Sequence, residues 1–457
     1  MLGVMAVQRA PQFSALSKRV AGLMTRAHSD LADVVALPSV HLDPTKRDDC
    51  RASAAWVRGA FSDAGVDSLV MDTIDGSQTI LGFVPGPAGA PTVLLYSHHD
   101  VQPSGPEELW DSAPFSLTER DGRWFGRGSS DCKGNLVAIL TALRALDPLP
   151  PVGIRIVIEG SEEAGGEGLD HLARTRPELF DADMILICDT GNVAPGIPTL
   201  TTSLRGMAAV KVSTETLASE VHSGQFGGGA PDALAALIAG LATLRDADGN
   251  TTIDGLPNDQ AWPGAPYDPS EFRSDSTTLD GVDLIGSGSP AEMVWARPAV
   301  TVIGIDAPPT AGAPAAINPR AAAQLNLRVP PGMDPDEAAA ALEKHLRQHI
   351  PWHARVDVEI QATGAPFSAV TTGPGYTALT AAMTKAYGRP VVHSGQGGSI
   401  PLCTVLAEIC PDAEIALLGV EEPACRIHAP NESVDPNEIS KTALSLALFL
   451  SKYGAQN

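Results

Sequence analysis

The chain has 457 residues, of which 44% are hydrophobic and 19% charged, so it is long and apolar enough for about two or three packed domains. Its formal net charge of -23 argues against nucleic acid or an anionic membrane as a partner, because phosphate groups would be repelled. No apolar stretch reaches the ~18 residues that span a bilayer, and the six cysteines show no paired spacing, so we expect a reduced, cytoplasmic protein.

Strands and helices alternate over the first 200 residues. Amphipathic helices are expected at about 13–36 and 47–64, and an apolar helix at 136–146. Apolar strands are expected at 92–97, 154–160 and 184–189. Such alternation predicts a mainly parallel sheet with helices on both faces.

The pattern changes near residue 205 and returns near 367. The intervening elements follow the order β-α-β-β-α-β, which is typical of a ferredoxin-like sheet. Its expected strands are 207–213, 299–305, 322–329 and 355–362, and its helices are 231–245 and 335–350. Residues 246–298 are rich in Asp, Gly and Pro and indicate a long irregular connection. We therefore expect residues 1–204 and 367–457 to form one α/β domain, with residues 205–366 inserted in it.

The α/β pattern then continues to the end of the chain. The remaining expected elements are a helix at 374–387, a strand at 390–394, a Gly-rich turn at 395–401 before another helix, a strand at 414–420 and a helix at 436–453.

Metal-ligand residues follow the predicted core strands. His98-His99-Asp100, Glu162-Glu163 and Asp189 each come at a strand end, and ligands of an open parallel sheet bind beyond its carboxyl edge. Asp131 precedes a helix, and His428 follows the strand at 414–420. Each signal is weak alone, since an Asp before a helix is usually an N-cap and paired glutamates are usually solvated. Together they favour Zn²⁺, with Mn²⁺ or Co²⁺ as alternatives. Five ligands fill two sites only if one carboxylate is shared.

Several segments resemble the dipeptidase/carnosinase branch of the aminoacylase family of two-metal peptidases, and they occur in that family's order. They are SHHDVQP, GRGSSDCKGN, EGSEEAGGEG, CDTGN and RIHAPNE, with VHSGQFGG and GGSIP as further matches. The resemblance implies a phosphorylase/hydrolase-like catalytic domain and an inserted lid that serves as dimerisation domain.

The resemblance also implies roles for single residues. One metal would be bound by His98 and Asp189 and the other by Glu163 and His428, with Asp131 as the bridge. Asp100 would orient His98. A metal-bound hydroxide would attack the amide carbonyl, with Glu162 as general base. Glu162 and Glu163 are expected to diverge because neighbours on an extended backbone point different ways. A cis peptide bond is expected after Asp131.

The resemblance assigns the substrate contacts to three further residues. His222 would come from the partner subunit of a homodimer and stabilise the oxyanion, although a histidine in a turn is the plainer interpretation. Arg328 and Ser399 would hold the carboxylate of a small peptide substrate. Without the family, Arg328 would be an exposed strand residue and Ser399 an N-cap.

Substrate preference stays open, because the sequence departs from the family twice. Gly395-Gln396 stands where dipeptidases often carry Arg-Glu, and AAINPR (315–320) lacks the Asn that is often found a few residues before its Pro. A relaxed-specificity dipeptidase is the main hypothesis, and an N-acyl-amino-acid deacylase of the acetylornithine or succinyl-diaminopimelate type is the alternative. A non-catalytic scaffold is disfavoured, because every expected ligand and Glu162 are present. Cys132 and Cys188 are interpreted as small buried residues, not nucleophiles.

Overall fold

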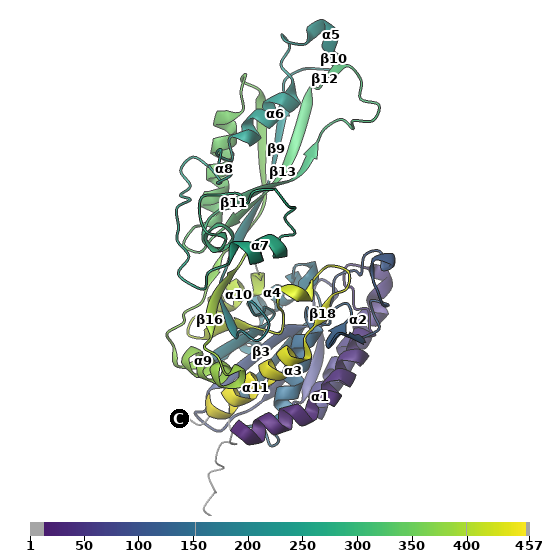
Figure 1. Ribbon diagram of the computed structural model, residues 1–457, viewed down its shortest axis with the longest axis vertical. Coiled ribbons are helices and arrows are strands. Elements are labelled where there is room, and N and C mark those ends of the chain that lie inside the picture. Colours follow the sequence, from purple (N-terminus) through teal and green to yellow (C-terminus); the bar gives the residue numbers. More distant parts are fainter. Residues whose placement is uncertain (1–12, 151, 399, 454–457) are drawn as a thin grey trace, which may run out of the picture. The chain divides into compact units, whose positions relative to one another are not determined.

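The computed structural model describes residues 13–150, 152–398 and 400–453, and the chain divides into two compact units (Figure 1). The second unit comprises Ser203–Ser368 together with Gly395–Ile400, and the rest of the chain forms the first. The Gly-rich turn after residue 394 therefore clusters with the second unit, whereas the sequence pattern assigned it to the first.

A nine-stranded sheet carries the first unit, in the order β1-β2-β6-β3-β7-β17-β8-β15, with β16 beside β8. Its strands are β1 (Ser68–Asp72), β2 (Gln78–Val84), β3 (Thr92–His98), β6 (Gly153–Glu159), β7 (Met184–Cys188), β8 (Thr199–Leu204), β15 (Phe367–Ser368), β16 (Val392–Gln396) and β17 (Glu414–Leu418). A smaller sheet is formed by β4 (Thr118–Arg120), β5 (Arg123–Phe125) and β18 (Ser433–Val434).

Only the centre of the large sheet is parallel. The strands β6, β3, β7 and β17 run parallel to their neighbours in this group, whereas β1, β2 and β8 pair antiparallel. The prediction of a mainly parallel sheet was therefore too broad. It missed β1, β2 and β8. A short turn joins β1 to β2, and such a turn can connect only antiparallel strands.

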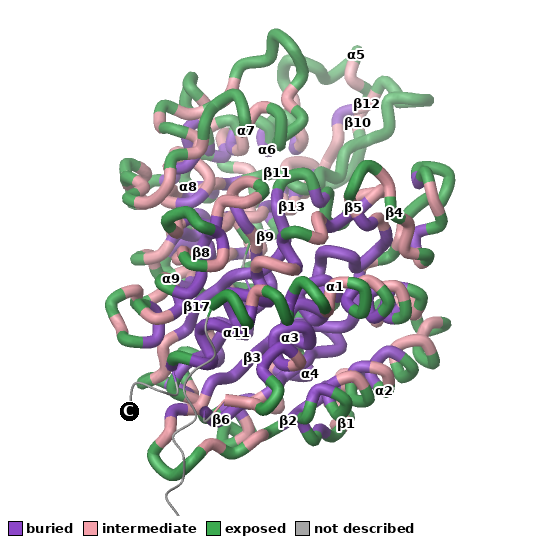
Figure 2. The backbone as a smooth tube through the Cα atoms, turned by 60° about the horizontal axis from the view of Figure 1, so that its bottom comes forward, coloured by how far each residue is buried: buried purple, intermediate pink, exposed green. Residues whose placement is uncertain are grey.

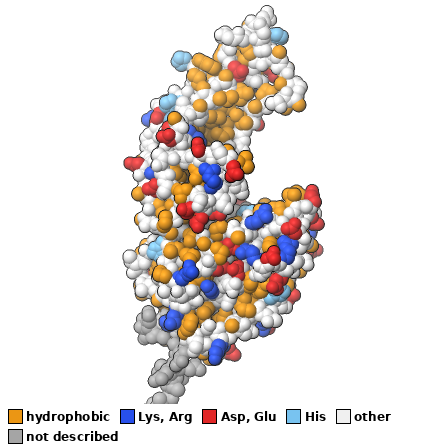
Figure 3. All heavy atoms as spheres, in the orientation of Figure 1, with side chains coloured by type: hydrophobic (Ala, Val, Ile, Leu, Met, Phe, Trp, Pro, Cys, Tyr) orange, Lys and Arg blue, Asp and Glu red, His pale blue; other side chains and the backbone are white. Residues whose placement is uncertain are grey.

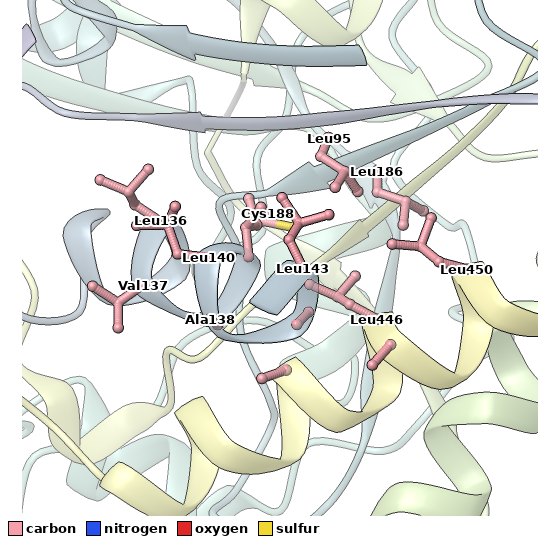
Figure 4. Packing of buried hydrophobic residues seen from close by; sticks show 14 of the residues in the cluster. Leu95, Leu136, Val137, Ala138, Leu140, Leu143, Leu186, Cys188, Leu446 and Leu450 are labelled. Carbon is pink, nitrogen blue, oxygen red and sulfur yellow. The ribbon is translucent and has the colours of Figure 1, made fainter. Parts of the chain in front are cut away.

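Helices cover both faces of this sheet, as predicted. They are α1 (Phe13–Val35), α2 (Arg47–Asp63), α3 (Lys133–Ala145), α4 (Glu167–Thr175), α9 (Pro374–Tyr387), α10 (Pro401–Ile409) and α11 (Pro436–Tyr453). Leucines of α3 and α11 pack against Leu95, Leu186 and Cys188 on one face (Figure 4). The alternate strand residues, such as Tyr96 and Ile187, are also fully buried. Burial on both faces explains why these strands are continuous apolar runs (Figure 2).

The second unit has a four-stranded antiparallel sheet in the order β11-β13-β9-β14, with α6 and α8 packed on one face. Its elements are β9 (Gly206–Glu215), α6 (Ala233–Ala242), β11 (Ala299–Asp306), β13 (Arg320–Val329), α8 (Pro335–His349) and β14 (Arg355–Gly364). Shorter ones are β10 (Val221–His222), α5 (Ser223–Phe226), α7 (Pro269–Asp275) and β12 (Ala316–Ile317). The β-α-β-β-α-β order is as predicted, and residues 246–298 are irregular apart from α7 and one turn at Glu292–Ala296.

All six cysteines carry free thiols, as their spacing predicted. Among the described residues, the helices lack the combination of length and apolar character that crossing a bilayer requires.

Candidate metal centre

Three neighbouring strands deliver polar side chains to one edge of the large sheet. β3 pairs in parallel with both β6 and β7, so their carboxyl ends lie together. His98 ends β3, the pair Glu162-Glu163 follows β6, and Asp189 directly follows β7. The convergence expected from the strand order is therefore present.

His98 is fully buried and faces two carboxylates. Its Nε2 atom lies 3.1 Å from Oδ1 of Asp131 and 3.2 Å from Oδ1 of Asp189. Its Nδ1 atom lies 3.1 Å from the carbonyl oxygen of Asp100 and 3.3 Å from the carboxylate of the same residue. Because Asp100 occupies Nδ1, the ring presents Nε2 to the acidic pair.

Asp131 joins this group to a second one. Its Oδ2 atom lies 2.9 Å from Nε2 of His428, which in turn lies 3.1 Å from Oε2 of Glu163. One carboxylate thus has one oxygen directed at each histidine. Asp131 does not cap α3, whose N-cap is Cys132 with no side-chain hydrogen bond, so the usual role of an Asp before a helix does not apply. The peptide bond between Asp131 and Cys132 is cis, as expected.

The donor set fits two divalent cations. The ligand atoms of His98, Asp131 and Asp189 lie within 4.8 Å of one another, and so do those of Asp131, Glu163 and His428. Hydrogen bonds to Asp131 and Glu163 raise the pKa of His428 to about 10, so this cluster holds a positive charge strongly. A divalent cation would take the place of that proton. Mixed imidazole and carboxylate donors suit Zn²⁺, Mn²⁺ or Co²⁺.

His428 has an uncommon backbone conformation. Its φ angle is +61°, and those of Arg426 and Asn431 in the same loop are +55° and +63°. Residues other than glycine adopt this region at a cost, and such strained positions cluster at functional sites. The loop aims the half-exposed ring of His428 at Asp131 and Glu163.

The two adjacent glutamates lie in a single 3-10 turn, Glu162–Ala164, and not on extended backbone. The prediction that they diverge because of strand alternation was therefore wrong in its reason. In a 3-10 turn successive side chains are rotated by about 120°, which also separates them. The turn is closed by Gly165 and Gly166, whose φ angles are +101° and +68°, so the glycines do allow the tight turn.

Asp100 and Gln102 hold this turn against β3. The carboxylate of Asp100 accepts hydrogen bonds from the backbone N–H groups of Glu162 (3.2 Å) and Glu163 (3.0 Å). The side-chain amide of Gln102 donates to Oε2 of Glu163 at 2.9 Å. Sequence reasoning gave Gln102 no role, although it lies within the segment SHHDVQP.

Two more supporting carboxylates were missed because no local signal marks them. Asp75, in the turn between β1 and β2, accepts from Ser161 Oγ at 2.7 Å and from Gly168 N at 3.0 Å, so it holds both ends of the glutamate loop. Glu432, which is fully buried, accepts from Arg127 at 2.6 Å and from the N–H of Asp131 at 3.1 Å. These contacts span long sequence separations, so only the fold reveals them.

Cys132 also lies within the first cluster. Its thiol donates to the carbonyl of Cys188 at 3.0 Å, and burial raises its pKa well above the ordinary value. A neutral, hydrogen-bonded thiol agrees with the interpretation of Cys132 as a small buried residue.

The remaining predicted site residues belong to the second unit. His222 is exposed, and its Nδ1 atom accepts a hydrogen bond from the N–H of Gly224 at 3.1 Å. Arg328 lies half-buried on β13 and forms no ion pair with any described residue. Ser399 lies outside the described residues.

Arg205 is a further candidate that sequence reasoning missed. It is only 8% exposed, yet its Nε and Nη1 atoms find no hydrogen-bond partner among the described residues. Burial, together with the charge of Arg328, lowers the pKa of Arg205 to about 10. A Cβ atom at Gly397 would come within 2.9 Å of the Arg205 guanidinium, so the backbone at Gly397 approaches it closely. Two neighbouring arginines without a counter-ion are typical of an anion site.

Comparisons with known proteins agree with this geometry. The chain is 45% identical to a cysteinylglycine-S-conjugate dipeptidase of Corynebacterium striatum over 435 residues, which cover 94% of this chain and 96% of the relative. It is 28% identical to a Cys-Gly metallodipeptidase of Schizosaccharomyces pombe, over 90% of this chain and 92% of the relative. The crystal structure of human carnosine dipeptidase 1 has the same fold, with a TM-score of 0.80 at 24% identity over 97% of this chain and 99% of that one.

A family model described as peptidase family M20/M25/M40 matches residues 94–452. This match spans the ligand-bearing segments of the first unit and the whole of the second. It confirms the resemblance to two-metal peptidases that the sequence segments indicated. The chain belongs to peptidase family M20/M25/M40.

Proposed function

We propose that the protein is a two-metal dipeptidase that prefers cysteinylglycine dipeptides with a substituent on sulfur. The observation that carries the metal chemistry is the position of Asp131, whose two oxygens face His98 and His428 at 3.1 and 2.9 Å. In this proposal His98 and Asp189 would hold one ion, Glu163 and His428 would hold the other, and Asp131 would serve both. Zn²⁺ is the favoured ion.

Two divalent ions held here would polarise the amide carbonyl and lower the pKa of bound water from 15.7 to about 7. The protein itself supplies the proton transfer. Burial, and after it the charge of Asp189, raises the pKa of Glu162, so its carboxylate is a stronger base than a solvated glutamate. Glu162 accepts the proton of the attacking water and returns it to the leaving amine. Asp100 keeps Glu162 in position through the backbone bond at 3.2 Å.

The substrate carboxylate is assigned to Arg205 and Arg328. Both guanidinium groups lack a carboxylate partner among the described residues, and a free carboxyl terminus would supply one. The expected contact of Ser399 with this carboxylate remains part of the proposal.

The preference for S-substituted substrates rests on two observations. The relative from Corynebacterium striatum, which is 45% identical over nearly the whole length, is named for such conjugates. In addition, Arg205 lines a cavity of about 910 Å³ in the second unit, together with Tyr267, Phe272, Met293 and other mostly apolar residues. An apolar cavity beside a carboxylate site suits a peptide with a bulky apolar substituent.

We further propose a homodimer formed through the second unit. β11 is an edge strand that pairs only with β13 among the described strands, and Val302, Ile303 and Ile305 on it are 45%, 60% and 46% exposed. Hydrophobic side chains gather on this part of the second unit (Figure 3). An exposed apolar edge strand is normally covered, and a second copy would cover it.

In the dimer His222 acts on the active site of its partner. Because Nδ1 of His222 accepts the Gly224 N–H, the neutral ring carries its proton on Nε2 and can donate to an oxyanion. Mixing two inactive variants, His222→Ala and Glu162→Ala, should restore part of the activity, because a mixed dimer contains one complete site. Absence of any recovery, with mixed dimers demonstrated by differential tagging, would contradict this arrangement.

A substrate panel tests the activity itself. S-benzyl-cysteinylglycine, cysteinylglycine, β-alanyl-histidine, N-acetylornithine and N-succinyl-diaminopimelate would be compared by kcat/KM with Zn²⁺-loaded protein. The proposal predicts the highest value for S-benzyl-cysteinylglycine and negligible cleavage of both acylated amino acids. Cleavage of only the acylated amino acids would establish the deacylase alternative.

A further inference from the structure

Three potential ligands meet in the second unit, at a place that the proposed hydrolysis does not use. His345 and His349 lie one turn apart on α8, and Asp254 comes from the irregular segment that follows α6. Oδ2 of Asp254 lies 2.7 Å from Nε2 of His349 and 3.4 Å from Nδ1 of His345. We propose that Asp254, His345 and His349 form a separate binding site for one divalent transition-metal ion of the Zn²⁺ type.

The tautomer of His345 supports this proposal. The hydroxyl of Thr243 donates to the carbonyl of Gly240 at 2.7 Å, so its oxygen is free to accept from Nε2 of His345 at 2.9 Å. The ring proton is therefore on Nε2, and the lone pair of Nδ1 faces Asp254. A fixed N–H on the far side of the ring is the usual support of a metal-binding histidine. In the metal-free protein, the N–H of Asp254 donates to this lone pair at 3.1 Å, and an ion would replace that bond.

The spacing and exposure of the three groups suit an ion that enters from solvent. Their ligand atoms lie within 4.8 Å of one another. The side chain of His345 is 3% exposed, whereas those of His349 and Asp254 are 38% and 54% exposed. One ligand is thus fixed in the interior and two can adjust, which leaves room for water at the remaining position. Histidines four residues apart on a helix present both rings to one ion.

The plainer interpretation is a surface hydrogen bond between His349 and Asp254 above a buried structural histidine. The two imidazoles stack with their centroids 4.1 Å apart, and the carboxylate of Asp254 lies within reach of both rings. Burial, and then the charge of His349, lowers the pKa of His345, which keeps that ring neutral and available as a ligand. A shared cation accounts for both rings and for the carboxylate between them.

Such an ion would fasten the last turns of α8 to the start of the long irregular segment. Ile253, next to Asp254, is buried in the core between the sheet and its helices. The ligands are 91 and 95 residues apart along the chain. A cross-link of this kind would stabilise the second unit without taking part in catalysis.

The test uses full-length protein in which the metal centre is disabled by His98→Ala and His428→Ala. Titration with Zn²⁺ should find one remaining equivalent that raises the melting temperature. Adding Asp254→Ala should weaken this binding by more than about 100-fold, because loss of even an outer partner of a metal ligand costs about 10- to 100-fold. Gln348→Ala, a change at an exposed neighbour on α8, is the matched control and should bind as the parent does. Equal Zn²⁺ binding with and without Asp254 would overturn the proposal.

Two further variants test the role of the ring proton in otherwise unchanged protein. Thr243→Val removes the acceptor for Nε2 of His345 and should weaken binding about 10- to 100-fold, whereas Thr243→Ser should restore it. If the disabled background does not fold, metal analysis of wild type against Asp254→Ala replaces it. The expected difference is one equivalent of Zn²⁺ per chain with unchanged dipeptidase activity, and an identical metal content would refute the site.

Discussion

The buried carboxylate of Glu432 is predicted to be the strongest single support of the metal centre. Its Oε2 atom accepts from Arg127 at 2.6 Å and from Gly128 N at 3.0 Å. Its Oε1 atom accepts from the N–H groups of Ser130 and Asp131 at 3.0 and 3.1 Å. Glu432→Gln preserves the shape but must turn an NH₂ group toward one of these two pairs of donors. Either orientation removes two hydrogen bonds and the negative charge.

The cost follows from burial. The side chains of Glu432 and Arg127 are 0% and 1% exposed, so removing the charge of Glu432 leaves a buried, unpaired guanidinium. Breaking a buried pair in this way costs about 3–5 kcal/mol. The bond to the N–H of Asp131 is lost or weakened as well, so the bridging carboxylate is held less firmly. Metal affinity should fall about 10- to 100-fold, as for other outer partners of metal ligands.

Urea unfolding of the metal-free protein measures the first effect, and competition with a chelating dye measures the second. Replacing both partners, as in Arg127→Met with Glu432→Leu, should not restore stability, because three backbone N–H groups then lose their acceptor at about 1–3 kcal/mol each. An unfolding free energy within about 1 kcal/mol of wild type for Glu432→Gln would refute this reasoning.

Two other predictions concern the glutamate loop and the substrate carboxylate. Asp75→Asn should lower kcat with little change in KM, because the loop 161–168 loses the carboxylate that accepts its hydrogen bonds. Thr73→Val is the control, since it removes a different hydrogen bond to the same carboxylate. Equal effects of the two variants in steady-state kinetics would contradict the anchoring role. Arg205→Met should raise KM for dipeptides by at least about tenfold, because the substrate carboxylate loses a charged partner. It should also increase thermal stability, because it removes a buried charge that has no partner among the described residues. A lower melting temperature with unchanged KM would contradict the assignment.

The sequence predicts this fold well where periodicity is strong. The long apolar strands of the sheet centre and the helices with apolar faces are all present. A strand that is buried on both faces is an uninterrupted run of apolar residues, which is easily recognised in the sequence. The missed strands β1, β2 and β8 are antiparallel. β1 is partly exposed, and β8 consists mostly of threonine and serine although it is buried, so neither forms an uninterrupted apolar run.

The residues of the candidate site also differ in whether the sequence marks them. His98, Asp131, Glu163, Asp189 and His428 could be predicted because strand ends and family segments mark them. Asp75 and Glu432 could not, since each acts through contacts more than 80 residues away in sequence. Arg205 could not be predicted for another reason. It differs from an ordinary surface arginine only in being buried with no hydrogen-bond partner for Nε and Nη1 among the described residues.

Glu162 and Glu163 have separate tasks in the proposed mechanism, one as general base and the other as metal ligand. The most direct measurement combines metal content and kcat for Glu162→Gln and Glu163→Gln, both loaded with Zn²⁺. Glu162→Gln is predicted to keep two equivalents per chain at the metal centre while kcat falls about 10²- to 10⁴-fold. Glu163→Gln should lose about one equivalent. Retained turnover in metal-loaded Glu162→Gln, or equal metal loss in both variants, would contradict the account.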